Sequence, residues 1–348
     1  MTSPEDEAEP TERPAVAADG ATPADASPAR PGAGTFTIDG RAAPALFVVG
    51  WLATVLGLGI LAIGVLSGPG GAATVLSLAG LVLTSVGLVA GAGSQGIERR
   101  ARARARAAYR GPSPVLVFAA SVPISLLAIV VLTVPISLVG LAVDGPVGRF
   151  ASVAAQAVIY IGLVRLLVVD AGALSWAAMG LRRPDAAAIR EFGRGAAWAL
   201  PVIAATLPLA VLLRLLLPVM PQSPLPPTGE TAGFLIQLVA GAVIAPVGEE
   251  ILFRGLATTA WVRSHGVRRG LIRGALFFAV VHVLTISGSS ASEAASLALV
   301  GFATRIPVAL ALGWLFVRSG SIWVPIGLHA TFNAILLILG EVALRQVG

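Results

Sequence analysis

Residues 233–258 read GFLIQLVAGAVIAPVGEEILFRGLAT, and this stretch decides what kind of molecule the chain forms. It is long and apolar enough to cross a bilayer as a helix, yet it holds the carboxylates of Glu249 and Glu250 and the guanidinium of Arg254. A charged side chain at the centre of a membrane helix costs about 2.5–3.5 kcal/mol on insertion scales, so intramembrane charges usually have a function. The stretch therefore predicts a membrane helix with a functional site. The bland alternative is that both glutamates lie among lipid headgroups at a helix end.

The whole chain shares this apolar character. Of its 348 residues, 56% are hydrophobic and 12% are charged, and its mean hydropathy is +0.88. The apolar runs are continuous rather than alternating, which favours membrane helices over a membrane β-barrel. We therefore expect an all-α polytopic membrane helix bundle with about eight or nine transmembrane helices. The apolar segments are 45–66, 72–92, 114–142, 151–169, 195–217, 233–258, 271–287, 295–317 and 322–340. The 295–317 segment contains Arg305 and Pro307, which leaves open whether it forms one helix or two short pieces.

Arginine supplies every basic residue of the chain, and its distribution predicts the orientation. Arginines cluster in the loops at 93–113, 170–194 and 261–273, whereas the alternate loops at 67–71, 143–150, 218–232 and 288–294 have one arginine among them. The positive-inside rule then places the N-terminus and the arginine-rich loops in the cytoplasm, with the protein in the plasma membrane. Nine spans would put the C-terminus outside. Within 170–194, mixed apolar and basic positions predict a short interfacial helix.

Composition also predicts three parts of the chain. Residues 1–42 are acidic, rich in proline and alanine, and poor in large apolar residues, so we expect a disordered cytoplasmic tail without a cleavable signal peptide. Residues 43–113 should form an N-terminal helical hairpin and a basic loop. Residues 114–348 should form the membrane core, with the motifs described below in 230–340.

Two function classes can be set aside from composition. The chain has no cysteine, which excludes disulfides, thiolate nucleophiles and cysteine-ligated zinc. The pI near 11.2 comes mostly from arginines in loops beside membrane segments, so we expect no nucleic-acid partner.

The spacing of the charged residues suggests a division of roles. Glu250 and Arg254 are four residues apart and share one face of a helix, whereas Glu249 lies about 100° around from Glu250. One carboxylate can therefore pair with Arg254. The unpaired, desolvated carboxylate has a raised proton affinity and suits a general base.

Two of the three histidines also fall in apolar segments. Phe278 and His282 are four apart, as are His329 and Asn333, so each pair projects to one helix face. Counting residues from the cytoplasmic loops places Glu250, His282 and His329 about 12–20 Å from that boundary. We expect a site near the cytoplasmic leaflet. The third histidine, His265, lies in a basic loop and should be solvated.

Three motifs carry a family resemblance. Glu249 to Arg254 fits EExxxR, Phe278 to His282 fits FxxxH, and His329 to Asn333 fits HxxxN. In this order on successive membrane segments, they resemble the CPBP intramembrane endopeptidases (CAAX protease and bacteriocin-processing, or Abi, proteins). The resemblance covers about 230–340.

The resemblance implies hydrolysis of a peptide bond by a glutamate-activated water. Glu249 would activate the water, His282 would orient it or a metal, and His329 and Asn333 would stabilise the oxyanion. Glu250 and Arg254 would shape and neutralise the site. The expected substrate is a hydrophobic, membrane-associated or lipidated peptide or protein, and membrane lipids are the other partner.

Cofactor and source remain open. The family is often described as metalloproteases, but the chain lacks an HExxH helix, so the cofactor is unknown. Zinc or another divalent ion, held by Glu249, His282 and His329, is one alternative. The exclusive use of arginine fits a bacterial genome rich in GC. Because bacteria generally lack protein prenylation, a bacterial source would favour bacteriocin maturation or immunity over prenylated substrates. The sequence leaves the oligomeric state open.

Two other function classes fit the same polar residues. They could form a proton or cation relay in an ion-coupled transporter. The chain could also be a catalytically silent membrane scaffold.

Overall fold

A computed structural model describes residues 38, 40–102, 109–217, 219 and 225–347. Every regular element in these ranges is helical. Eight helices or continuous helical runs among them are long and apolar enough to cross a membrane. The prediction of an all-α polytopic membrane bundle is therefore confirmed. Most of the tail expected at 1–42 lies outside the described residues.

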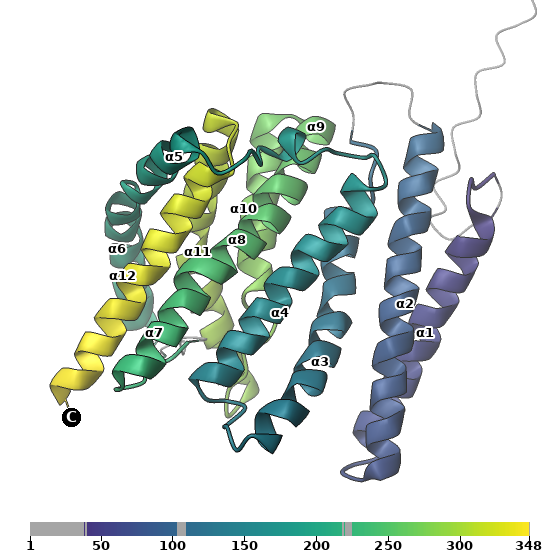
Figure 1. Ribbon diagram of the computed structural model, residues 1–348, viewed down its shortest axis with the longest axis horizontal. Helices are drawn as coiled ribbons and strands as arrows, with labels where there is room; N and C mark the ends of the chain where they lie inside the picture. Colours follow the sequence, from purple (N-terminus) through teal and green to yellow (C-terminus); the bar gives the residue numbers. More distant parts are fainter. Residues whose placement is uncertain (1–37, 39, 103–108, 218, 220–224, 348) are drawn as a thin grey trace, which may run out of the picture. The chain divides into compact units, whose positions relative to one another are not determined.

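The helices follow the chain order labelled in Figure 1. Several of them continue through short π-helical or 3-10 segments, designated η. The elements are α1 (Pro44–Leu66), α2 (Gly71–Arg102), α3 (Pro114–Leu138), α4 (Pro146–Val164), η1 (Arg165–Val169), η2 (Ala177–Met179), α5 (Ala186–Ala196), α6 (Ala199–Leu216), α7 (Thr231–Val239), η3 (Ala240–Ile244), α8 (Ala245–Glu250), η4 (Ile251–Thr258), α9 (Thr259–His265), α10 (Val267–Val281), α11 (Ala291–Ser319) and α12 (Trp323–Val347).

The first two helices form an antiparallel hairpin held by small residues. A Cβ added to Gly57 would lie 2.5 Å from the backbone nitrogen of Thr84, and one added to Gly80 would lie 2.5 Å from that of Leu61. Glycine therefore lets the two backbones approach closely, which is how membrane helices pack without a hydrophobic driving force.

The region predicted as the span 271–287 is shorter than expected. Helix α10 has 15 residues and ends at Val281. Its end coincides with His282, whose ring Nδ1 lies 2.7 Å from the Phe278 carbonyl oxygen, while the backbone nitrogen of His282 is 3.4 Å from the same oxygen. The ring and the backbone N–H of His282 thus share one carbonyl oxygen at the end of α10.

The next helix settles the question left open for 295–317. Helix α11 runs without interruption over 29 residues and contains both Arg305 and Pro307. It is therefore one membrane helix and not two pieces.

A short helix, α5, begins within 170–194 as predicted and leads almost directly into α6, while its place at the membrane interface stays a prediction. The carboxylate of Asp185 accepts a 2.8 Å hydrogen bond from the backbone nitrogen of Ala188 and so caps the first turn of α5. This bond, with other backbone N–H groups nearby, lowers the pKa of Asp185 below its ordinary value.

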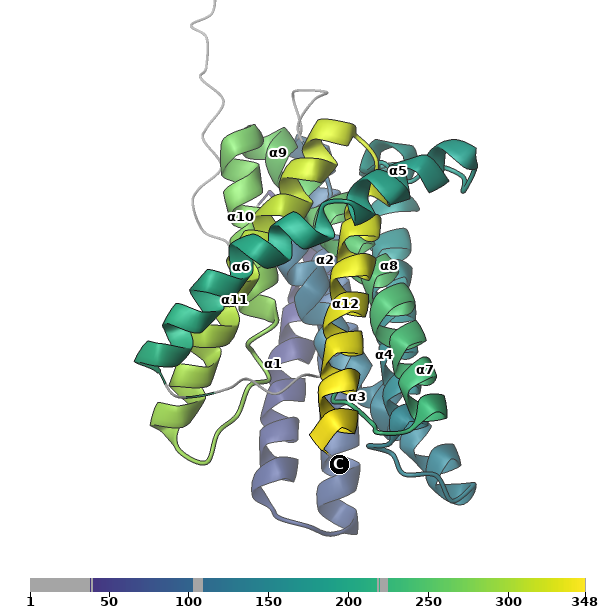
Figure 2. The same cartoon turned by 90° about the vertical axis from the view of Figure 1, so that its left-hand side faces the viewer.

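The packing places α8 between two other membrane helices. Figure 1 shows α8 between α4 and α12, and both of these helices contact it. A Cβ on Gly248 would lie 2.7 Å from the Cα of Ala157 in α4, so glycine is required where α8 meets α4. Helix α6 runs obliquely across α11 (Figure 2). The consequence is that Glu249 and Glu250, which follow Gly248, lie inside the bundle.

Candidate active site

The two glutamates lie on a helix that widens into a π-helix at two places. From Thr231 to His265 the chain is helical throughout, but η3 and η4 are π-helical and flank the short α-helical segment α8. A π-helix is wider than an α-helix and occurs frequently at functional sites. In η4, the hydroxyls of Thr258 and Thr259 donate to the carbonyls of Phe253 and Arg254, five residues earlier. These bonds satisfy carbonyls where the winding is wider.

Pro246 explains where Asn333 is held. In the π register at the end of η3, the Ala245 N–H donates to the Ala240 carbonyl. The next bond in this register would join residue 246 to the Gly241 carbonyl, but Pro246 has no N–H. The Asn333 side chain donates to that carbonyl instead, at 2.9 Å. A proline on one helix therefore creates an acceptor that binds and orients an amide on α12.

Glu250 lies at the centre of a buried charged group. One of its carboxylate oxygens, Oε1, accepts a 2.9 Å hydrogen bond from Arg254 Nη1 and lies 2.7 Å from Nδ1 of His329. The side chains of Glu250 and Arg254 are 0% and 2% exposed. Because an ionised carboxylate only accepts hydrogen bonds, His329 must carry a proton on Nδ1. Its Nε2 then points away from Glu250.

Glu249 lies close to both intramembrane histidines. Its Oε2 is 3.4 Å from Nε2 of His282 and 3.8 Å from Nε2 of His329. The His282 ring is oriented by the Phe278 carbonyl, which accepts only, so Nδ1 of His282 must donate to it. Both imidazoles thus carry a proton on Nδ1 and direct Nε2 toward the same carboxylate oxygen. This arrangement can hold a water or move a proton.

Phe278 connects these groups through its ring. The ring centroid is 4.1 Å from that of His282 and 5.9 Å from that of His329. On the same ring, the Arg254 guanidinium carbon lies 4.3 Å from the centroid, a cation–π geometry. A buried aromatic side chain therefore sets the spacing between the two histidines and the arginine.

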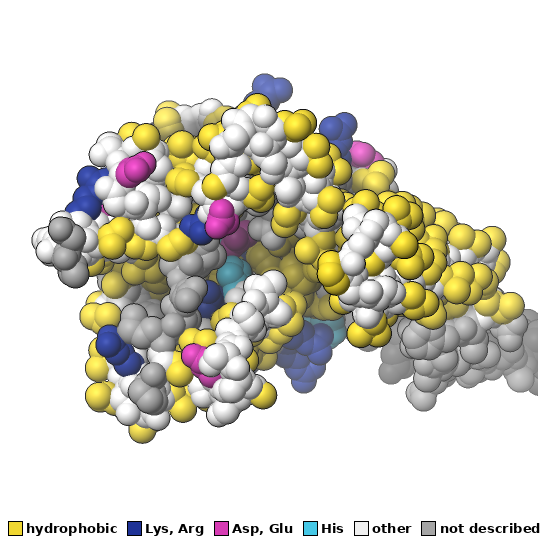
Figure 3. Space-filling model, turned by 90° about the horizontal axis from the view of Figure 1, so that it is seen from below, with side chains coloured by type: hydrophobic (Ala, Val, Ile, Leu, Met, Phe, Trp, Pro, Cys, Tyr) yellow, Lys and Arg dark blue, Asp and Glu magenta, His cyan; other side chains and the backbone are white. Residues whose placement is uncertain are grey.

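Exposure distinguishes the two glutamates. The Glu249 side chain is 17% exposed and that of His282 is 24% exposed, in contrast to the fully buried Glu250. Figure 3 views the end of the bundle where α7 begins and α12 finishes, and it shows a histidine side chain in a hollow between helices. The side chains of Glu249 and His282 are therefore partly open, whereas Oε2 of Glu249 itself is buried and has no hydrogen-bond partner among the described residues.

Residues 231–335 match the family model described as type II CAAX prenyl endopeptidase Rce1-like. The chain contains an Rce1-like domain. This confirms the family resemblance predicted from the three motifs, and it supports an intramembrane endopeptidase. No curated protein and no solved structure matches the chain significantly.

The Rce1-like domain includes every candidate residue predicted from the sequence. Glu249, His282 and His329 come together, Glu250 pairs with Arg254, and Phe278 lies between the rings. Asn333 lies on α12 one turn beyond His329, with its amide bonded to Gly241. The remaining histidine, His265, is exposed at the end of α9.

The sequence left open whether the site holds a metal ion. In the part of the chain that the structure describes, no group of three or more histidine, aspartate or glutamate side chains is arranged to hold a metal ion. Glu249, His282 and His329 therefore do not fit a metal in this arrangement, and the chemistry below uses only the chain's own groups.

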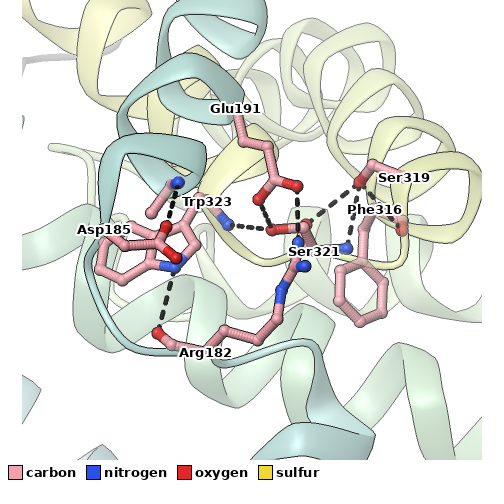
Figure 4. Close-up of polar contacts among 8 residues, drawn as sticks. Arg182, Asp185, Glu191, Phe316, Ser319, Ser321 and Trp323 are labelled. Atoms are coloured by element: carbon pink, nitrogen blue, oxygen red, sulfur yellow. Dashed lines mark hydrogen bonds and ion pairs between the residues drawn. The ribbon is translucent and has the colours of Figure 1, made fainter.

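The sequence analysis did not predict a polar network at the start of α12, the helix that carries His329. Figure 4 shows Glu191 of α5 between Arg182 and Ser321. Arg182 Nη2 and the Ser321 hydroxyl each lie 2.5 Å from a different oxygen of the Glu191 carboxylate. The Trp323 indole donates to the Arg182 carbonyl at 3.2 Å.

Close backbone contacts accompany this network. A Cβ on Gly327 would overlap the Phe192 carbonyl, and one on Gly195 would overlap the Val324 carbonyl. The helices α5 and α12 therefore pack backbone to backbone just before His329. Only the glycines and the turn at Ser319–Trp323 signal this contact in the sequence, since Glu191 resembles an ordinary interfacial charge.

Proposed function

We propose that the chain hydrolyses a peptide bond in a hydrophobic, membrane-associated or lipidated peptide, using a water activated by Glu249. The observation that carries this proposal is the position of Glu249 Oε2 beside Nε2 of both His282 and His329. A general base must lie within hydrogen-bond reach of the proton that it takes, directly or through one water. The Rce1-like match supports the same reaction class.

In the first step, water donates one proton to Glu249 while its oxygen attacks the substrate carbonyl carbon. Nε2 of His282 accepts the other water proton in a hydrogen bond and so orients the oxygen. This role uses the lone pair of Nε2, which is available in the tautomer whose Nδ1 donates to the Phe278 carbonyl.

The attack places negative charge on the carbonyl oxygen. To donate from Nε2 to this oxyanion while Nδ1 donates to Glu250, His329 would carry a proton on both ring nitrogens. Asn333 offers a second N–H besides the one bonded to Gly241. Collapse of the intermediate breaks the C–N bond, and Glu249 returns its proton to the leaving amine.

Glu250 and Arg254 act without touching the reacting atoms. Their ion pair neutralises charge in the bundle, and the Glu250 carboxylate fixes the tautomer and rotation of His329. These two are therefore positioning residues.

The test is cleavage by the purified protein in lipid nanodiscs. Two peptides of one apolar sequence, with and without a farnesylated cysteine, would be digested and their products identified by mass spectrometry. Membrane peptides from cells with wild-type or Glu249→Gln protein would be compared in parallel. We expect products that disappear with Glu249→Gln and persist with Glu230→Gln, which alters an exposed glutamate at the start of α7. Products that persist with Glu249→Gln would contradict the assigned base. The pair of peptides distinguishes a lipidated from a merely hydrophobic substrate.

A further inference from the structure

Arg305 is a charged residue that the proposed reaction does not use. It lies at the middle of α11, about 14 residues from each end, which corresponds to about 21 Å along the axis in either direction. A lipid headgroup at either surface is therefore out of its reach. A charge at this depth is costly unless it has a counter-charge or a function.

The position of Arg305 places it beside the active site. Its Nη1 donates to the carbonyl of Gly301, one turn earlier, at 2.8 Å. Gly301 itself packs on the segment that follows His282, since a Cβ there would lie 3.0 Å from Ile286 Cδ1 and 3.3 Å from Val283 Cγ1. Arg305 is also close enough to Glu249 to interact with it electrostatically.

The guanidinium lacks an acidic partner in the described part of the chain. Two buried carboxylates already have arginine partners: Glu250 pairs with Arg254, and Glu341 pairs with Arg345. Among the residues that the structure describes, Arg305 forms no ion pair. Its side chain donates a hydrogen bond to the Gly301 carbonyl. A guanidinium has five N–H donors in a planar fork that matches a carboxylate.

We propose that Arg305 binds a carboxylate of the peptide substrate and thereby selects where the chain is cut. This inference rests on the proposed function. The carboxylate is either the C-terminal group of the peptide or an acidic side chain close to the scissile bond, because both offer the same two oxygens. Since Arg305 is close enough to Glu249 to interact with it electrostatically, the carboxylate and the scissile carbonyl must lie within a short peptide segment. An extended peptide covers about 3.3–3.6 Å per residue.

The experiment uses three fluorogenic peptides with one apolar sequence. The first ends in a free carboxylate, the second ends in an amide, and the third ends in an amide but has an internal glutamate. Cleavage is measured with wild-type protein, Arg305→Gln and Arg305→Lys in nanodiscs. Binding of the same peptides to Glu249→Gln protein, with and without Arg305→Gln, is measured by fluorescence anisotropy. The matched control is Arg214→Gln, which removes an exposed arginine of α6.

We expect wild-type protein to prefer a carboxylate peptide over the plain amide by about 10- to 100-fold in kcat/KM, the usual effect of a charge-assisted bidentate pair. Arg305→Gln should bring that ratio close to one, Arg305→Lys should retain part of it, and Arg214→Gln should leave it intact. Preference for the first peptide identifies the C-terminal group, and preference for the third identifies a side chain.

Two results would overturn the inference. One is equal treatment of all three peptides by wild-type protein, which needs no variant to fold. The other is a loss in Arg305→Gln that is equal for all peptides and accompanied by a shifted pH profile, because Arg305 would then act on Glu249. The binding measurements separate the two proposals, since carboxylate-dependent binding without cleavage would contradict only the proposed hydrolysis.

Discussion

Glu249 and Glu250 are adjacent in the chain but meet different surroundings. Glu250 is fully buried and bonded to Arg254 and His329, whereas Glu249 is partly exposed beside two histidine nitrogens. The difference follows from the rotation of about 100° per helical residue. At the scale of the residue, the helix thus gives two adjacent carboxylates different partners and different exposure.

Removing Arg254 should be costly because it strands the Glu250 charge in a buried position. We expect Arg254→Leu to lower the free energy of unfolding by about 3–5 kcal/mol. Thermal unfolding in detergent would measure this. Arg165→Leu breaks an exposed pair with Asp170, in which the two side chains are 71% and 55% exposed, so its loss should be about 0–1 kcal/mol. Equal melting temperatures for the two variants would show that Glu250 is solvated.

Asn333 should contribute to catalysis more than to folding. Asn333→Ala removes one proposed oxyanion donor and should slow turnover by about 10²–10³-fold at saturating substrate. Single-turnover kinetics would locate the loss in the chemical step. A rise in KM with unchanged kcat would assign Asn333 to substrate binding instead.

At the scale of the element, the continuous helix from α7 to α9 is irregular where it passes the candidate site. Pro246 interrupts the ladder, η3 widens the turn, and the freed Gly241 carbonyl binds Asn333. A proline inside a helix typically costs about 3 kcal/mol, so its presence beside the site indicates that the irregular winding serves the site.

Replacing Pro246 tests whether the irregular winding contributes to activity at the expense of stability. Pro246→Ala supplies a backbone N–H that competes with Asn333 for the Gly241 carbonyl. We expect a higher melting temperature together with a kcat reduced by about tenfold or more. Pro208→Ala, in the interior of α6, should raise the melting temperature without lowering kcat. If Pro246→Ala retained full activity, the Gly241 carbonyl would have no part in orienting Asn333.

The contact between the helices α5 and α12 is a second feature at the scale of the element. Ser321→Ala leaves one oxygen of Glu191 without its partner and should destabilise the protein by about 1–3 kcal/mol, while lowering kcat through His329. Ser319→Ala is the control, because its hydroxyl bonds only to carbonyls of the same turn region and to a backbone N–H. Melting curves and kcat would be measured together. A Ser321→Ala protein with normal values of both would leave α12 positioned by the glycine contacts alone.

At the scale of the whole molecule, the arginines should determine how the bundle sits in the membrane. Figure 1 shows that the ends of α2 and α9, which carry arginines, lie at the opposite end of the bundle from the C-terminus. The positive-inside rule then predicts that this end faces the cytoplasm.

Cysteine labelling would test the orientation, since the chain has no cysteine of its own. A cysteine at Pro227, an exposed position before α7, should react with an impermeant maleimide added outside intact cells. A cysteine at the exposed His265 should react only after the cells are opened. The reverse pattern would invert the predicted topology.

Much of the fold and part of the site follow from local pattern, because hydropathy and helical spacing act over a few residues. The membrane helices, the Glu250–Arg254 pair and the facing of His282 with Phe278 are of this kind. The early end of α10 at Val281 was not predicted, because the sequence stays largely apolar beyond it and hydropathy does not mark where a helix ends.

The contacts that turn these residues into a site join distant parts of the chain. His329 meets Glu250 across 79 residues, Asn333 meets Gly241 across 92, and Ser321 meets Glu191 across 130. By itself, the sequence determined which residues are membrane-buried and chemically capable, because burial and helix periodicity are local properties. Only the tertiary structure decided which carboxylate faces both histidines and which carbonyl holds the amide. Those pairings depend on helix rotation and depth, which are set by glycine contacts and π-helical turns between segments far apart in the chain.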